Sequence, residues 1–371
     1  ASFTGKNGNV TGYGYDTNGN MITENRNTNR PAADQVTLAY SHDALGRKTS
    51  ATDGNGHTTT FQYDNLGKLR YETKQVTDPG TGQLVNVTTE SQYDAAGNKT
   101  RVIDPEGKAT SYAYDPMDRL SQVTDAKLNT VQFTYDAAGN KTATKDRNGG
   151  WTYFAFDKNN RMISATDPEN NVTTYAYDEE GNQIQATDPL GRVTSKTHDR
   201  LGRVVSSTEP DEGGATRTTT HAYDAAGNLT STTDPLSHTT ANVYDELGRP
   251  KQVTDPLGNS SYAAYDGMGN KVKTRDARGN ETSFAFSPNN WLITVTDPAA
   301  GITVYAHDKA GNRTGQTDAE GRVTLYSHDE LNRLKEEKVD AGGGNWLLQR
   351  NYTYDKTGHV LSDTTGEGAI T

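Results

Sequence analysis

The 371-residue chain has no cysteine, only 31% hydrophobic residues and a mean hydropathy of −0.89. The missing cysteine excludes a disulfide framework and any cysteine-ligated metal centre. No run of about 18 apolar residues occurs, so no membrane-spanning helix is expected. Acidic residues outnumber basic ones by 48 to 37, giving a net charge of −11 without a basic cluster, so a nucleic-acid partner is not expected.

So polar a composition is typical of disordered segments. Twenty tyrosines oppose that interpretation, because they can bury a large area without raising the hydropathy. The first residues, Ala1 to Gly5, contain neither the basic nor the apolar region of a signal peptide. Since repeated motifs fill the chain from about residue 13 to residue 359, we interpret 1–371 as one repeat array excised from a longer protein.

The repeated motif is an aromatic residue followed by Asp, with Gly three places after the Asp. It occupies 16 slots, of which 15 have the Asp and one has Ser287 in its place. Of the 15 intervals between successive slots, 11 are 21 residues long. A fixed period of this kind indicates stacked supersecondary units. The slots open at Tyr15, His42, Tyr63, Tyr93, Tyr114, Tyr135, Phe156, Tyr177, His198, Tyr223, Tyr244, Tyr265, Phe286, His307, His328 and Tyr354.

The Gly position of the motif accepts only residues that tolerate a left-handed backbone. Gly occupies it in 12 copies, and the others have Asp118, Asn160, Asn290 and Asn332. The pattern predicts a type I turn closed by a left-handed residue, a common hairpin connection. We assign this structural role, and no catalytic, cofactor-binding or metal-binding role, to Tyr93, Asp94, Gly97, Tyr114, Asp115, Tyr135, Asp136, Gly139, Tyr177, Asp178, Gly181, Tyr223, Asp224, Gly227, Tyr244, Asp245, Gly248, Tyr265, Asp266 and Gly269.

A second turn lies half a period after the first, as in Asp104-Pro105-Glu106-Gly107, where Pro presets φ for the same turn type. The segments between turns have the length of strands, about 5–6 residues. Where the period breaks, the extra residues fall at the second turn, at 78–82, 209–214 and 340–344. We therefore expect an all-β fold, a long antiparallel hairpin ribbon of about 30 strands that spirals into a curved shell.

Strand alternation places aromatic pairs on one face of the ribbon, because the residue two before the slot is aromatic in 11 copies. With two strands per repeat, successive rungs of this ladder lie ~9.6 Å apart. The slot histidines His42, His198, His307 and His328 cannot share a zinc ion at that spacing, since Zn–N bonds are ~2 Å, so we interpret them as flat rings. Packing is the favoured role of the ladder, and contact with glycans is the alternative.

The tandem Tyr-Asp-x-x-Gly-Asn/Arg unit, alternating with Asp-Pro-x-Gly-Asn/Arg, resembles the RHS/YD-repeat family. That family includes bacterial Rhs and wall-associated polymorphic toxins, the cage subunits of insecticidal Tc complexes and the teneurin barrel. The resemblance implies a spiralling β-ribbon that forms part of a hollow cage. It further implies a C-terminal toxin domain as enclosed partner, held until a secretion apparatus or injection complex delivers it.

One feature of the bacterial family is missing from this sequence. There the repeats end in a segment that plugs the shell and in many members releases the toxin by self-cleavage. Here Asp188–Gly191 and Asp255–Gly258 are followed by Arg192 and Asn259 and lead into another repeat. We therefore assign no self-cleavage to this chain.

The sequence thus favours a structural shell segment of an exported bacterial protein, secreted or at the cell surface, without enzymatic activity or cofactor. The rival hypothesis is a cell-surface adhesin or carbohydrate-binding repeat protein. An enzyme site in irregular loops near 78–88 is a third, and the spacing of known calcium loops is absent. Excision would leave edge strands near Tyr15 and Tyr354, and their edge-to-edge pairing should associate copies of the chain.

Overall fold

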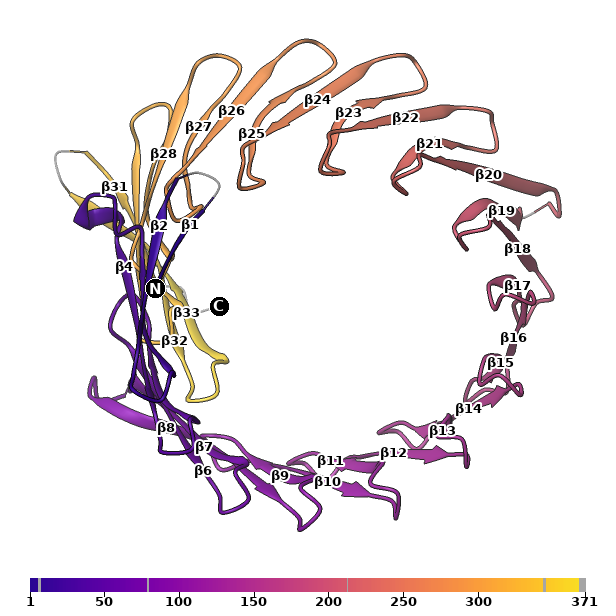
Figure 1. Ribbon diagram of the computed structural model, residues 1–371, viewed down its shortest axis with the longest axis horizontal. Coiled ribbons are helices and arrows are strands. Elements are labelled where there is room, and N and C mark those ends of the chain that lie inside the picture. The colour runs from indigo at the N-terminus through magenta and orange to yellow at the C-terminus, as the bar shows by residue number, and fades with distance from the viewer. Residues whose placement is uncertain (6–7, 79, 212, 343–344, 367–371) are drawn as a thin grey trace. The chain divides into compact units, whose positions relative to one another are not determined.

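The computed structural model describes residues 1–5, 8–78, 80–211, 213–342 and 345–366. In these residues it contains 33 strands, assigned to one antiparallel sheet, and one short 3-10 helix (Figure 1). The predicted all-β hairpin ribbon is therefore confirmed. Most strands have five or six residues, as the spacing of the turns indicates.

The strands follow one another without intervening α-helices in the described residues. In chain order they are β1 (Ser2–Thr4), β2 (Val10–Tyr15), β3 (Met21–Arg26), then the 3-10 helix η1 (Ala32–Asp34), β4 (Val36–His42), β5 (Lys48–Thr52), β6 (Thr58–Tyr63), β7 (Leu69–Thr77), β8 (Leu84–Tyr93), β9 (Lys99–Ile103), β10 (Ala109–Tyr114), β11 (Leu120–Thr124), β12 (Thr130–Tyr135), β13 (Lys141–Lys145), β14 (Trp151–Phe156), β15 (Met162–Thr166), β16 (Val172–Tyr177), β17 (Gln183–Thr187), β18 (Val193–His198), β19 (Val204–Pro210), β20 (Thr216–Tyr223), β21 (Leu229–Thr233), β22 (Thr239–Tyr244), β23 (Pro250–Thr254), β24 (Ser260–Tyr265), β25 (Lys271–Arg275), β26 (Glu281–Phe286), β27 (Leu292–Thr296), β28 (Ile302–His307), β29 (Arg313–Thr317), β30 (Val323–His328), β31 (Leu334–Asp340), β32 (Trp346–Tyr354) and β33 (Val360–Thr365).

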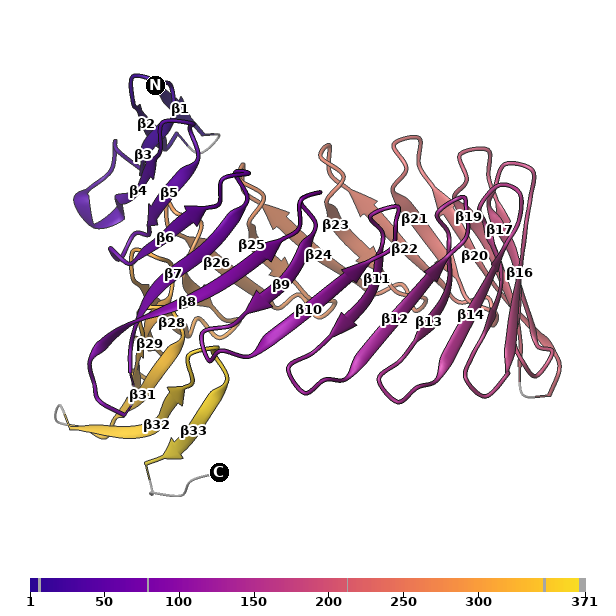
Figure 2. The ribbon, with the colours of Figure 1, turned by 90° about the horizontal axis from the view of Figure 1, so that it is seen from below.

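Contacts between residues divide the chain into two compact units, one formed by 1–109 and 264–371 and the other by 110–263. In the second unit, each strand from β11 to β23 pairs antiparallel with the strands before and after it. Its hairpins follow an arc (Figure 1), and their turns alternate between two edges (Figure 2). The expectation that 1–371 is a single array stays a prediction.

Fifteen of the sixteen hairpins that carry the aromatic-Asp turn show the same irregularity. The register shifts by one residue directly before the slot, for example between Thr134 and Tyr135 and between Ala155 and Phe156. Such a bulge increases the local twist and bends the strand. Because the bulge recurs with the motif, the bend recurs with it.

In the first unit, turns of early repeats lie against turns of much later repeats. The side-chain amide of Asn55 donates to the carboxylate of Asp308 over 2.9 Å, and Glu330 accepts hydrogen bonds from the backbone N–H and the hydroxyl of Thr77. The partners in these bonds are 253 residues apart. The turns after β5 and β7 thus lie against the turns after β28 and β30. We call this contact the seam.

Two sequence interpretations of the first unit are wrong. The edge strands are not those that end at Tyr15 and Tyr354, because β1 pairs with β2 and β33 pairs with β32. Residues 84–88 do not form an irregular loop, because β8 continues the ladder with β7 as far as the pair Thr77 and Leu84. The insertion therefore lengthens a hairpin. Residues 79, 212, 343 and 344 of the three insertions lie outside the described residues.

The sheet has no thick apolar core. In the described residues only Val36, Val76, Val87 and Ala143 are buried hydrophobic residues, and no large side chain is completely buried. Along β16 exposed and half-buried residues alternate one by one. Both faces of the ribbon therefore remain accessible to solvent over most of its length.

Candidate functional site

The turns built by the aromatic-Asp motif are the candidate site, because the sequence singled out these residues. In one copy the N–H of Asp136 donates to the carbonyl of Asn140, and the N–H of Gly139 donates back to the carbonyl of Asp136. The carboxylate of Asp136 accepts the N–H of Asn140 over 2.8 Å. This closes a hairpin loop in which the last turn residue is left-handed, with φ of 94° at Gly139.

The assigned residues occupy the same places in each repeat. The tyrosines are the last residues of β8, β10, β12, β16, β20, β22 and β24, each Asp opens the turn, and each Gly has a positive φ. The substitutes Asp118, Asn160, Asn290 and Asn332 also have positive φ, between 59° and 63°. These side chains are spread over successive repeats and form no single cluster.

Hydrogen bonds favour the ionised form of several turn carboxylates. The side chain of Arg119 donates to Asp115 over 2.7 Å and lowers the pKa of that carboxyl. The side-chain amide of Asn140 does the same for the pKa of Asp136. Hydrogen bonds donated to a carboxylate favour its charged form. The aspartates therefore act as fixed hydrogen-bond acceptors of the turn.

The slot tyrosine ties its own repeat to the one before. The hydroxyl of Tyr135 donates to the carbonyl of Leu120 over 2.8 Å, and Tyr177 bonds the carbonyl of Met162 over 2.7 Å. The accepting residue opens the strand that follows the preceding turn. The same bond is made by Tyr63, Tyr93, Tyr223, Tyr244 and Tyr354. Each of these slot tyrosines therefore supplies both the packing of its ring and one hydrogen bond to the preceding repeat.

The residue four places after the turn Asp makes a second link to the next repeat. Where it is Arg, the guanidinium donates to the Asp of the same turn and lies over the ring of the slot tyrosine in the next repeat. It also donates to the backbone carbonyl of the residue that follows that tyrosine. Arg119 lies 4.7 Å from the ring centroid of Tyr135 and donates to the carbonyl of Asp136 over 2.7 Å. Arg161, Arg203 and Arg333 repeat this arrangement. We call it the Arg junction.

Where that residue is Asn, the link is different. Asn140 donates to Asp136 over 2.9 Å and to the left-handed Asn160 of the next repeat over 2.8 Å. In another repeat the left-handed residue that faces the Asn is Gly202. There the amide oxygen of Asn182 lies only 2.9 Å from the position that a Cβ atom of residue 202 would occupy. We call this the Asn junction.

The two junctions alternate along the ribbon, so the structural period is two sequence repeats. From slot 93 to slot 265 the deciding residues are Asn98, Arg119, Asn140, Arg161, Asn182, Arg203, Asn228, Arg249 and Asn270. Sequence reasoning missed this alternation. Its signal is visible in the sequence, since Asn and Arg take turns at a fixed distance from the motif.

The slot histidines stand where the tyrosine rings stand in other repeats. The Nδ1 atoms of His42, His198, His307 and His328 are buried and lack a hydrogen-bond partner among the described residues. Burial lowers the pKa of His307, whose ring packs 5.7 Å from that of Trp291. In the described part of the chain no three His, Cys, Asp or Glu side chains gather as a metal site would require. The ring of His307 thus packs as an aromatic ring would at this slot.

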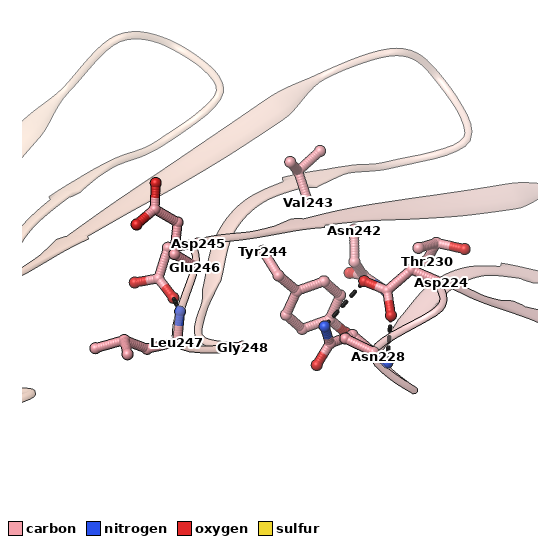
Figure 3. Close-up of a pocket in the computed structure, with 11 residues that line it drawn as sticks. Asp224, Asn228, Thr230, Asn242, Val243, Tyr244, Asp245, Glu246, Leu247 and Gly248 are labelled. Carbon is pink, nitrogen blue, oxygen red and sulfur yellow. Dashed lines mark hydrogen bonds between the residues drawn. The ribbon is translucent and has the colours of Figure 1, made fainter.

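A shallow groove separates successive turns at an Asn junction (Figure 3). Asp224, Asn228, Tyr244, Asp245 and Glu246 are among the residues that line it. A similar groove recurs two repeats earlier, between residues 178 and 202. The carboxylates of Asp224 and Asp245 are engaged by backbone groups of their own turns. The groove is an acidic, polar surface between turns, and the absence of enzymatic activity stays a prediction.

Comparison with known families identifies the repeat. A family profile described as RHS Repeat matches eight segments, which together cover more than two-thirds of the chain: 42–83, 93–130, 156–193, 177–213, 198–239, 244–282, 286–323 and 307–345. The chain belongs to the RHS repeat family. The resemblance drawn from the motif is therefore confirmed, and the aromatic-Asp turns are RHS turns.

Solved structures share the RHS fold over nearly the whole chain. The chain is similar to a TcdB2-TccC3-Cdc42 structure, with a TM-score of 0.75 and 15% identity over 98% of this chain and 24% of the other. It is similar to TcdB2-TccC3 without its hypervariable C-terminal region, with a TM-score of 0.73 and 15% identity over 96% and 23%. A Tc holotoxin pore of Photorhabdus luminescens gives a TM-score of 0.62 and 16% identity over 98% and 24%.

The RHS chain spans about a quarter of the length of these structures. None of the curated proteins compared with the chain matches it. In the described residues no helix combines the length and the apolar character that crossing a membrane requires.

Proposed function

We propose that this chain is a shell segment of a longer, exported RHS protein that encloses a toxin or effector domain until delivery. The secretion apparatus is part of this proposal as the delivering partner. The chain's contribution is mechanical: it forms the wall. Neither a cofactor nor a catalytic residue is needed for that work.

The observation that carries the proposal is the single layer of the sheet. A sheet that filled a globular domain would bury one face beneath helices or a second sheet. Here 33 strands leave both faces accessible, with four buried hydrophobic residues in the described part of the chain. Such a layer encloses a volume at small cost in residues and leaves one face free to meet a cargo.

The seam gives the wall lateral strength. Its hydrogen bonds join repeats that are 253 to 279 residues apart, so the ribbon is held at its rims as well as along its strands. Among the similar structures, one is described as a Tc holotoxin pore and another as TcdB2-TccC3 without its hypervariable C-terminal region. These observations support a wall with a replaceable domain beyond it.

The glycan-binding alternative finds less support in the aromatic ladder. Sugars stack on open ring faces, whereas a cation lies over many of these rings. Arg47 is 4.7 Å from the ring centroid of Tyr63, and Lys141 is 4.4 Å from that of Phe133. Glycan contact and an adhesive role nonetheless stay predictions.

The test is protease protection of the C-terminal domain in the full-length protein. We expect that domain to resist digestion while the wall is intact. Gly54→Val, which opens the seam, should make it sensitive, while the exposed control Arg192→Ala should not. Digestion at the same rate in the wild type and the opened variant would contradict encapsulation.

A further inference from the structure

The seam joins two kinds of turn tip in a regular order. One side is the second-turn rim, formed by the tips of the second turns, and the other is the YD rim, formed by the tips of the aromatic-Asp turns. Asn27 donates to Asn289 over 2.8 Å, Asn55 donates to Asp308 over 2.9 Å, and the backbone N–H of Thr77 donates to Glu330. The second-turn side comprises residues 27–34, 53–56, 77–78 and 104–107, and the YD side comprises 287–290, 308–311, 329–332 and 355–358.

The contact advances by one repeat on both sides at each step. The second turn of each early repeat meets the aromatic-Asp turn twelve repeats later. The fourth step follows the same rule, because Pro105 and Glu106 line one hollow together with Asp355 and Lys356. The rims therefore fit each other as repeating surfaces, and the fit does not depend on one particular pair of residues.

Close approach and burial show that the fit is tight. A Cβ at Gly54 would collide with the carbonyl oxygen of Lys309. Asn9, Asn27, Val36 and Val76, which are buried, all lie on the early side of this unit. Most buried residues of the described chain are thus found where rims meet.

We call the parts of the two rims that lie in the seam covered and the remaining parts uncovered. The exposure of apolar turn tips differs between them. Leu331, at the third position of its turn, is half-buried and lines a hollow with Leu38 and Tyr40. Leu201 and Leu247 hold the same turn position and are 74% and 63% exposed. The uncovered YD rim carries exposed tips at Leu45, Leu66, Met117, Leu201, Leu247 and Met268, and the uncovered second-turn rim carries them at Leu128, Leu190, Leu236 and Leu257.

We propose that the uncovered YD rim binds the uncovered second-turn rim of a second copy of this chain, in the manner of the seam. Both halves of the contact are present in every copy, and the uncovered rims are built from the same turn motifs as the covered ones. The contact is head-to-tail, so in a pair one copy keeps a free YD rim and the other keeps a free second-turn rim. Further copies can therefore bind at both ends of the pair. Burial of the leucine and methionine tips drives the association. The inference does not depend on what the ribbon encloses.

The experiment uses two variants that each block one rim. Leu201→Asn with Leu247→Asn alters the YD rim, and Leu190→Asn with Leu257→Asn alters the second-turn rim. Asn is a native residue at this turn position in Asn148 and Asn159, so the turns should still form. Circular dichroism checks the fold of each variant, and sedimentation velocity over a range of concentrations measures association.

We expect the wild type to associate as its concentration rises and each variant alone to stay monomeric. A mixture of the two variants should form a one-to-one complex of twice the monomer mass and nothing larger, because one intact rim of each kind remains. A monomeric wild type or a monomeric mixture would overturn the proposal. The variant Val360→Lys blocks pairing at the outer strand β33 and leaves both rims intact. If this variant no longer associates, the proposal is also overturned.

Discussion

The seam of the first unit and the ribbon of the second unit are built from the same repeat, yet they bury different residues. At the seam Asn27 is only 3% exposed, and Val36 and Val76 are also buried. In the second unit, among described residues, Ala143 alone is buried. The repeat itself therefore supplies turns, ladders and junctions, whereas burial comes from contact between rims. Stability of the two regions should respond differently to mutation.

Acid should have the largest effect, and it should act on both regions alike. Turn carboxyls such as those of Asp115 and Asp136 have pKa values lowered below that of Asp in the unfolded chain, which is about 3.9. Their contribution is present above that unfolded pKa and is lost as pH falls through the folded pKa, because the folded state resists protonation. We expect the thermal midpoint to fall steeply as the pH drops below about 4.

Salt separates this cause from general charge repulsion. The carboxylates are held mainly by hydrogen bonds within the turn, so the loss in acid should persist at an ionic strength of about 1 M, where the Debye length is about 3 Å. A midpoint that recovers fully in salt would contradict the assignment.

Gly54→Val should have the largest effect among single substitutions and should act on the seam alone. The new side chain collides with the carbonyl of Lys309 and with Val36. Overpacking of this kind costs typically about 1–3 kcal/mol. Ala126→Val is the matched control, since Ala126 holds the same turn position in the second unit and is exposed. Hydrogen exchange of the two units measures the loss, and equal losses in both variants would count against the seam.

Asn27→Ala should be the next most damaging change. The buried side-chain amide donates to the carbonyl of Asp34 and to the Oδ1 atom of Asn289. Its removal leaves the Asn289 oxygen without this donor, while the Asp34 carbonyl keeps the hydrogen bond from Asn289. That costs about 1–3 kcal/mol. The exposed Asn148→Ala should stay within about 0.5 kcal/mol. Denaturant unfolding followed in the first unit provides the measurement, and a neutral Asn27→Ala would show that the seam bears little of the stability.

Arg203→Ala should have the smallest effect of the four and sharpens the comparison within the second unit. It removes an ion pair with Asp199 and a cation over the ring of Tyr223. Together these contribute about 1–2 kcal/mol. Arg192 makes a similar ion pair with Asp188, but its side chain is 61% exposed against 26% for Arg203. Arg192→Ala should therefore cost at most about 1 kcal/mol, and equal costs would mean that the ring contributes nothing.

Local conformation could be predicted because it follows from residue type at a fixed spacing. Asp118, Asn160 and Asn332 stand in place of Gly, and each has the left-handed φ that this substitution pattern indicates. The second turn shows the limit of such reasoning. Leu128 and Ala300 are left-handed as well, with φ of 66° and 65°, although neither type favours that region. There the ladders on both sides fix the loop length and impose the conformation.

The candidate site was predictable only in part for a similar reason. The slot tyrosines and turn aspartates are evident from the period, but the carbonyl that Tyr135 reaches and the ring that Arg119 covers belong to neighbouring repeats. A spacing along one chain does not show which atoms of adjacent strands meet. The regular exchange of Asn and Arg was visible and was the one clue to the junctions.

The sequence by itself determined the repeat, the turn chemistry, the antiparallel ribbon and the family, because each depends on backbone preferences and strand alternation within about 20 residues. Tertiary structure alone decided that the second turn of one repeat meets the aromatic-Asp turn twelve repeats later. That offset depends on small bends and twists added at every bulge, and no single residue encodes their sum. It also decided which of the many equivalent turn tips are buried and which remain open to a partner.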